Sequence, residues 1–164
     1  MIRFLKYLFF IFIFLISCSC AQKHNSTIID QWQATIKMES CFPGGSPWNA
    51  SELGKNGEAR YNEEYAPLIK LCALPRNKII PVLISRLGSK NETEVHICPF
   101  SNAIEGELAV YVLNFITKKE WYLALNLKEC PDNRQVVLSA LSTKEGRDKF
   151  KNFYQFYASN TIKQ

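Results

Sequence analysis

The sequence predicts an all-α domain, a compact bundle of five to seven helices, from three observations. Apolar residues recur at helical spacing through most of the chain after residue 27. Two of these segments begin with a Ser or Asn followed three residues later by Glu, the capping-box pattern (Asn102 with Glu105, Ser142 with Glu145). In the last segment, aromatic residues fall at i, i+3, i+4 and i+7: Phe150, Phe153, Tyr154 and Tyr157.

The first predicted helix follows Ser26, a candidate N-cap, and ends near Glu39. One face of it carries Ile28, Ile29, Trp32 and Ile36. Residues 41–47 are rich in Gly and Pro and predict a loop. Residues 49–60 are polar with two glycines, and they predict either a short helix or a loop.

Two helices and a long loop are expected next. An amphipathic helix over residues 65–72 is stopped by Pro75. A second helix covers residues 77–87, with Pro81 near its first turn, where a missing N–H costs little. Gly88 is its expected C-cap. Residues 89–101 predict a long loop, which in a small domain is either functional or held in place, here by Cys98.

The second half of the chain continues the helical pattern. A helix from Asn102 buries Leu108, Ala109, Val112, Leu113 and Ile116. Residues 121–127 predict a short helix or an extended segment, Asp132 is a candidate cap for a helix through Leu141, and the last helix begins at Ser142. Strand at residues 95–98 or 121–127 is the main alternative to an all-α fold.

Residues 76–117 contain two segments that resemble the helix pair of a HEAT-type repeat. The first reads KIIPVLISRL from Lys78, and the second reads EGELAVYVLNFI from Glu105. The resemblance implies that the two helices pack as one hairpin. Because no period recurs three times, the pattern predicts one HEAT-like pair within a bundle and no solenoid.

The first seventeen residues have the pattern of a secretory signal. Arg3 and Lys6 precede an unbroken apolar run that ends at Ser17 and Cys18. The run is about half the roughly 20 residues that a spanning helix needs. Leu15-Ile16-Ser17-Cys18 resembles the lipobox of bacterial lipoproteins, which implies cleavage before Cys18 and attachment of acyl chains such as palmitate to it. Two or more acyl chains give stable membrane anchoring.

This resemblance divides the chain into a signal peptide (1–17), a lipid-anchored tether (18–26) and one helical domain (27–164). Ser19 after the lipidated position implies the outer membrane, facing the periplasm. Three alternatives remain. Cys20 could accept the lipid instead of Cys18, although it lacks the apolar residue three places upstream that a lipobox has. Cleavage after Ala21 would give a secreted protein. If the chain is not cleaved, the apolar run would stay as a membrane anchor.

Charge excludes a nucleic-acid partner. Removing residues 1–17 takes Arg3 and Lys6 away and lowers the formal net charge from +5 to +3. The longest basic run is then the pair Lys118-Lys119.

The body also contains four cysteines, Cys41, Cys72, Cys98 and Cys130. An even number in an exported domain predicts disulfides, and sequential pairing would join Cys41 to Cys72 and Cys98 to Cys130.

Catalytic and metal-binding patterns are scarce. The histidines are His24, in the tether, and His96, in the long loop. A Cys-dependent hydrolase would need His96 with one of the cysteines, and a zinc site would need close ligand pairs that the body lacks. The sequence therefore predicts no enzyme, no metal and no cofactor. Glu105 and Glu107 are interpreted as charges that offset a helix dipole.

These patterns predict a membrane-anchored envelope protein that binds another protein without catalysis. One specific form is an immunity-type lipoprotein that blocks an incoming toxin. The alternative is a structural or assembly accessory lipoprotein of the envelope. The expected contact residues are Glu92, Glu94 and His96 of the long loop, and either Phe156 or Tyr157 is a further candidate for an exposed partner contact.

Overall fold

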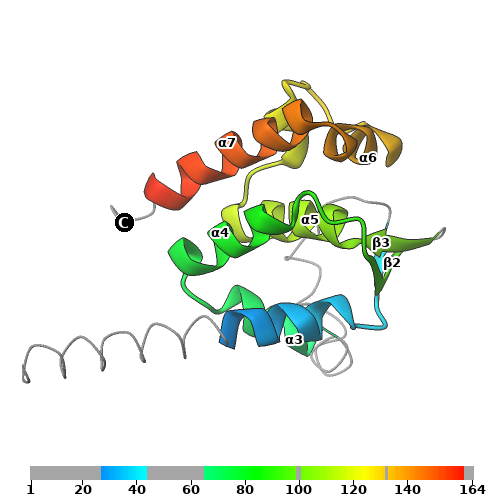
Figure 1. Ribbon diagram of the computed structural model, residues 1–164, viewed down its shortest axis with the longest axis vertical. Helices are drawn as coiled ribbons and strands as arrows, with labels where there is room; N and C mark the ends of the chain where they lie inside the picture. The colour runs from blue at the N-terminus through cyan, green and yellow to red at the C-terminus, as the bar shows by residue number, and fades with distance from the viewer. Residues whose placement is uncertain (1–26, 44–64, 99–100, 132, 161–164) are drawn as a thin grey trace, which may run out of the picture.

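The computed structural model describes residues 27–43, 65–98, 101–131 and 133–160 of the chain (Figure 1). The predicted signal peptide, Cys18 and the tether lie outside these residues, as does the segment 49–60. None of the helices in the described ranges is long and apolar enough to cross a membrane.

The fold is mostly helical, as predicted, with one small sheet. A helix over residues 27–36 is followed by α3 (Ala66–Cys72), α4 (Arg76–Arg86), α5 (Glu105–Thr117), the 3₁₀ helix η1 (Trp121–Leu125), α6 (Gln135–Ser142) and α7 (Lys144–Asn160). The strands are β1 (Cys41–Pro43), β2 (Glu92–Cys98) and β3 (Ser101–Ile104). Figure 1 shows three tiers, with the helix of residues 27–36 and α3 at the bottom, α4 and α5 in the middle, and α6 and α7 at the top.

The sheet replaces most of the predicted long loop at residues 89–101. Its strand order is β1-β2-β3, with β1 parallel and β3 antiparallel to β2. In β2, exposed residues alternate with buried ones, the period-two pattern of a half-buried strand. The loop prediction was therefore wrong, and the strand alternative at residues 95–98 is confirmed. The other ambiguous segment, 121–127, forms η1.

Helix α5 lies at the centre of the fold. Eleven of its thirteen residues are buried, and it contacts α4, α6, α7, η1, β2 and β3. A helix that is apolar on nearly all sides lies in a protein interior. The sequence predicted burial of only one face of this helix, so its burial was underestimated. Gly106 lets α5 approach α4 closely, because a Cβ there would lie 2.7 Å from the carbonyl oxygen of Leu87. The core also includes Trp32, Phe150 and Tyr154.

The two helices of the HEAT-like resemblance, α4 and α5, pack against each other, with the β2–β3 hairpin between them in the sequence. Pro81 lies inside α4 rather than near its first turn, because the helix begins at Arg76. The resemblance to a HEAT repeat itself stays a prediction.

The predicted helix caps are replaced by neighbouring groups. Asn102 lies in β3, so α5 has no capping box with Glu105, and its first two N–H groups donate to the carbonyl oxygens of Asn91 and Ser89. At α7 the N–H of Gly146 donates to Thr143 Oγ1, one residue after the predicted Ser142. At α6 the side chain of Asn133 accepts a hydrogen bond from the N–H of Gln135. Asp132, the predicted cap, lies outside the described residues.

Candidate partner-binding face

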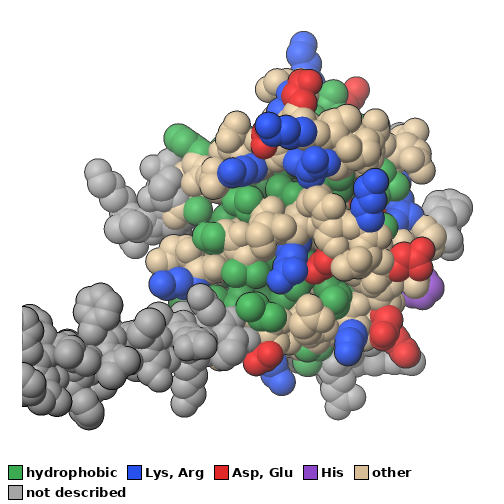
Figure 2. All heavy atoms as spheres, viewed as in Figure 1, with side chains coloured by type: hydrophobic (Ala, Val, Ile, Leu, Met, Phe, Trp, Pro, Cys, Tyr) green, Lys and Arg blue, Asp and Glu red, His purple; other side chains and the backbone are tan. Residues whose placement is uncertain are grey.

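The predicted contact residues lie together on the exposed side of β2. Glu92, Glu94 and His96 are all exposed, and Thr93, Val95 and Ile97 between them are buried. We call the three exposed side chains the acidic strand face. Figure 2 shows the histidine of the described residues beside acidic side chains at the right-hand edge of the molecule. The sequence assigned these residues to a loop, whereas they lie exposed in a row on a strand; their role as contact residues stays a prediction.

A bulge in β2 presents the middle of this face. Glu92 pairs with Ile104 and His96 with Asn102, so the register shifts between the two pairs. Glu94 lies within this irregularity. Bulges bend a strand and redirect its side chains, and they leave ladder groups without partners. Here the position of Glu94 depends on how those groups are satisfied.

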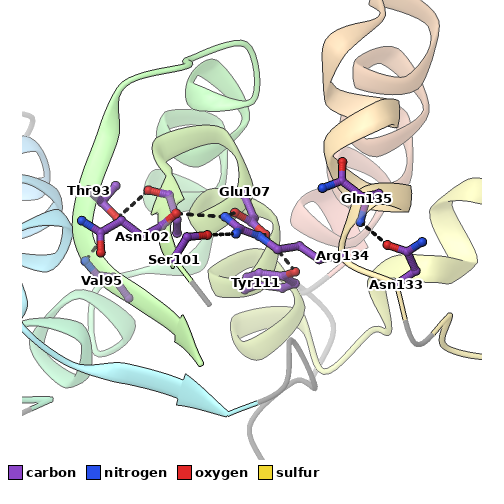
Figure 3. A network of polar contacts seen from close by, with 10 residues as sticks. Thr93, Val95, Ser101, Asn102, Glu107, Tyr111, Asn133, Arg134 and Gln135 are labelled. Atoms are coloured by element: carbon purple, nitrogen blue, oxygen red, sulfur yellow. Dashed lines mark hydrogen bonds and ion pairs between the residues drawn. The ribbon is translucent and has the colours of Figure 1, made fainter. Parts of the chain in front are cut away.

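The side chain of Thr93 makes two hydrogen bonds within the bulge. Its buried hydroxyl donates to the carbonyl oxygen of Ala103 at 2.9 Å and accepts from the N–H of Val95 at 3.3 Å (Figure 3). One side chain thus joins β2 to β3 and replaces part of the ladder. On the other side of β2, the N–H of His96 donates to the carbonyl oxygen of Ser40 at 2.8 Å. The strand is therefore fixed from both neighbours.

An ion pair between the half-buried Arg134 and the buried Glu107 fixes β3 to the helices. Arg134, which precedes α6, donates from Nε and Nη2 to the two carboxylate oxygens of Glu107, each at 2.6 Å. The same guanidinium donates to Ser101 Oγ and, at 2.9 Å, to the carbonyl oxygen of Asn102 (Figure 3). Arg134 therefore joins α6, α5 and β3, and a bidentate contact of this kind sets orientation as well as distance.

Electrostatics around this pair favour the charged state of the arginine. Glu107 is fully buried, and its hydrogen bonds raise the pKa of Arg134 further above its ordinary value. Tyr111, one turn along α5, donates to Glu107 Oε1 at 3.3 Å. Burial, and then the charge of Glu107, raise the pKa of the Tyr111 hydroxyl. Tyr111 therefore stays protonated and acts as a donor.

A second buried carboxylate supports the neighbouring turn. Glu105 Oε1 accepts from the indole N–H of Trp32 at 2.7 Å, and Oε2 accepts from Ser89 Oγ at 2.5 Å. Arg86 Nε lies 3.8 Å from Oε1. Both carboxylates lie in the first turn of α5, where they can offset the helix dipole as interpreted, but that interpretation is incomplete, because both are also buried and paired with arginines. We call Glu105, Glu107 and the partners named here the carboxylate network.

The cysteines do not form a reactive site among the described side chains. Cys72 has a free, half-buried thiol, and burial raises its pKa to about 12 although the charge of Lys118 opposes the shift. Cys130 is exposed, with Sγ 3.9 Å from the carbonyl oxygen of Pro131. The side chains of Cys41 and Cys98 lie outside the description. The pairs Cys41–Cys72 and Cys98–Cys130 stay predictions for the exported protein.

Other sequence expectations concern metals and aromatics. Within the described ranges, no group of three or more His, Cys, Asp or Glu is placed to hold a metal ion. Phe150 and Tyr154 are buried, Phe153 is half-buried, and Phe156 is 61% exposed, so the prediction of an outward aromatic is confirmed at Phe156.

Comparison with protein-family models, curated proteins and solved structures finds no match to this chain.

Proposed function

We propose that this chain is a lipid-anchored envelope protein that binds another protein through the acidic strand face. The observation that carries the proposal is the alternation along β2, which presents Glu92, Glu94 and His96 outward while the residues between them are buried. The strand already fixes the backbone that carries these three side chains, so binding need not order that backbone. Their charge favours a partner with a basic surface.

The support beneath this face strengthens the proposal. Thr93 holds the bulge, and Arg134 joins β3 to α5 and α6 through the buried Glu107. Groups positioned by such a buried network keep one geometry, which favours specific recognition. Immunity-type inhibition of a toxin is the specific form that we propose. An assembly role in the envelope would use the same face with a resident partner.

The test compares two variants of the full chain with the same loss of negative charge. Glu92→Ala/Glu94→Ala/His96→Ala removes the acidic strand face. Asp30→Ala/Asp148→Ala removes two exposed carboxylates from the helix of residues 27–36 and from α7. Each tagged chain is used to capture partners from detergent-solubilised envelopes. We expect a partner to bind the native chain and the Asp variant, and its binding to the triple variant to fall by about tenfold or more.

Equal capture by the triple variant would remove this face from consideration, provided that urea denaturation shows native stability. All three side chains are exposed, so each substitution should change the free energy of unfolding by about 0.5 kcal/mol or less. The captured protein also separates the two roles. An immunity protein should protect sensitive cells from its partner, whereas loss of an assembly protein should weaken the envelope.

A further inference from the structure

The C-terminal ends of α5 and α7 share a surface of aromatic and basic side chains, of which all but the half-buried Tyr157 are exposed. We call Lys118, Lys119, Phe156 and Tyr157 the aromatic–basic end. The rings of Phe156 and Tyr157 meet edge to face with centroids 5.2 Å apart, and Lys119 Nζ lies 5.2 Å from the Tyr157 centroid. These side chains are therefore contiguous, and the largest exposed apolar group among them is Phe156.

More cations lie at this end of the molecule. Lys118 lies over the ring of Phe115, 4.3 Å from its centroid, and its charge acts on Cys72 at the end of α3. Helix α4 starts four residues after Cys72 with exposed Arg76 and Lys78, and α4 packs against α7. Figure 1 shows the start of α4 and the end of α7 on the same side of the molecule.

We propose that the aromatic–basic end lies against the anionic headgroups of the membrane that holds the protein. This inference rests on the proposed anchor at Cys18. Exposed aromatics with flanking lysines are the groups that bind a bilayer interface, and each lysine near an anionic surface strengthens binding by a factor of about five. Positive charge complements anionic lipid, and this complementarity favours a membrane over a protein.

The position of the chain start supports this orientation. Eight residues lie between Cys18 and Thr27, the first described residue, so nine Cα–Cα steps join the two. A chain of that length spans at most about 30 Å, so the helix of residues 27–36 must begin close to the bilayer. In Figure 1 this helix begins on the same side as the end of α7, and β2 and β3 lie on the opposite side. The acidic strand face would then point away from the membrane, toward an arriving partner.

The experiment places a fluorescent reporter at each end of the lipidated full chain. Phe156→Trp marks the aromatic–basic end, and Glu94→Trp marks the acidic strand face as the matched control. Both proteins are reconstituted into vesicles of phosphatidylethanolamine and phosphatidylglycerol that contain brominated acyl chains. The native tryptophans give the same background in both. We expect Phe156→Trp to be quenched about threefold more than Glu94→Trp.

When Lys118→Gln/Lys119→Gln is added to the Phe156→Trp reporter, the ratio of docked to undocked protein should fall about 25-fold. Replacing the anionic vesicles by phosphatidylcholine vesicles should lower this ratio by a similar factor. Equal quenching of the two reporters would overturn the proposal. So would a blue shift of Phe156→Trp that grows with protein concentration in detergent without vesicles, because a second copy would then cover this surface. Mass spectrometry of the N-terminal fragment tests the Cys18 anchor separately, so failure of the anchor and of the docking surface can be distinguished.

Discussion

The two ends of α5 use charge in opposite ways. At its N-terminal end, Glu105 and Glu107 are buried and each faces an arginine. At its C-terminal end, Lys118 and Lys119 are exposed and lie over aromatic rings. Burial makes the first pair of charges dependent on their partners, whereas water solvates the second pair.

This difference predicts where substitutions act. Changes in the carboxylate network should lower stability and disturb the acidic strand face above it. Changes at the aromatic–basic end should leave stability nearly unchanged and alter only what the surface binds. One helix thus connects a region that maintains the fold with a region that is available for contact.

The largest effect is expected at Arg134. Arg134→Met leaves the carboxylate of Glu107 buried without its cation, which should lower the free energy of unfolding by about 3–5 kcal/mol. Urea denaturation followed by circular dichroism measures this change. Adding Glu107→Leu to Arg134→Met removes the orphaned charge, and we expect the double variant to regain most of the lost stability. If the double variant is no more stable than the single one, the ion pair is not the reason for the loss.

A smaller effect is expected from Thr93→Val, which keeps the shape of the side chain but removes its hydroxyl. The carbonyl of Ala103 and the N–H of Val95 then lose their partner inside the protein. We expect a loss of about 2 kcal/mol and faster hydrogen exchange at Val95. Thr117→Val is a suitable control, because that hydroxyl contacts only the carbonyl of Leu113 in its own helix, among the described contacts. Unchanged exchange at Val95 would show that Thr93 does not hold the bulge.

Local patterns predicted the helices well. The apolar spacing in residues 142–157 correctly indicated α7, including its buried Phe150 and Tyr154 and its exposed Phe156. The strand was predicted only as an alternative and only over residues 95–98, although Glu92 to Ile97 alternate between polar and less polar residues. The alternation is weak in the sequence because Thr93, which the strand buries, is itself polar.

The carboxylate network could not be predicted in the same way. Glu107 and Arg134 are 27 residues apart, and no local spacing relates them. Two carboxylates in the first turn of a helix normally complement its dipole in water. Only the burial of α5 on nearly all sides, a property of the whole fold, shows that both carboxylates must be paired.

The smallest effect is expected at Phe156, and it tests the other end of the comparison. Phe156→Ala removes a ring that is 61% exposed, so the free energy of unfolding should change by about 0.5 kcal/mol or less. Urea denaturation of this variant beside the native chain measures it. A loss above about 2 kcal/mol would show that the ring packs as a core side chain does. Substitutions at this surface would then destabilise the fold, as substitutions in the carboxylate network are expected to do. An unchanged midpoint would show that the Phe156 ring does not maintain the fold, which leaves this end of the protein available for contact.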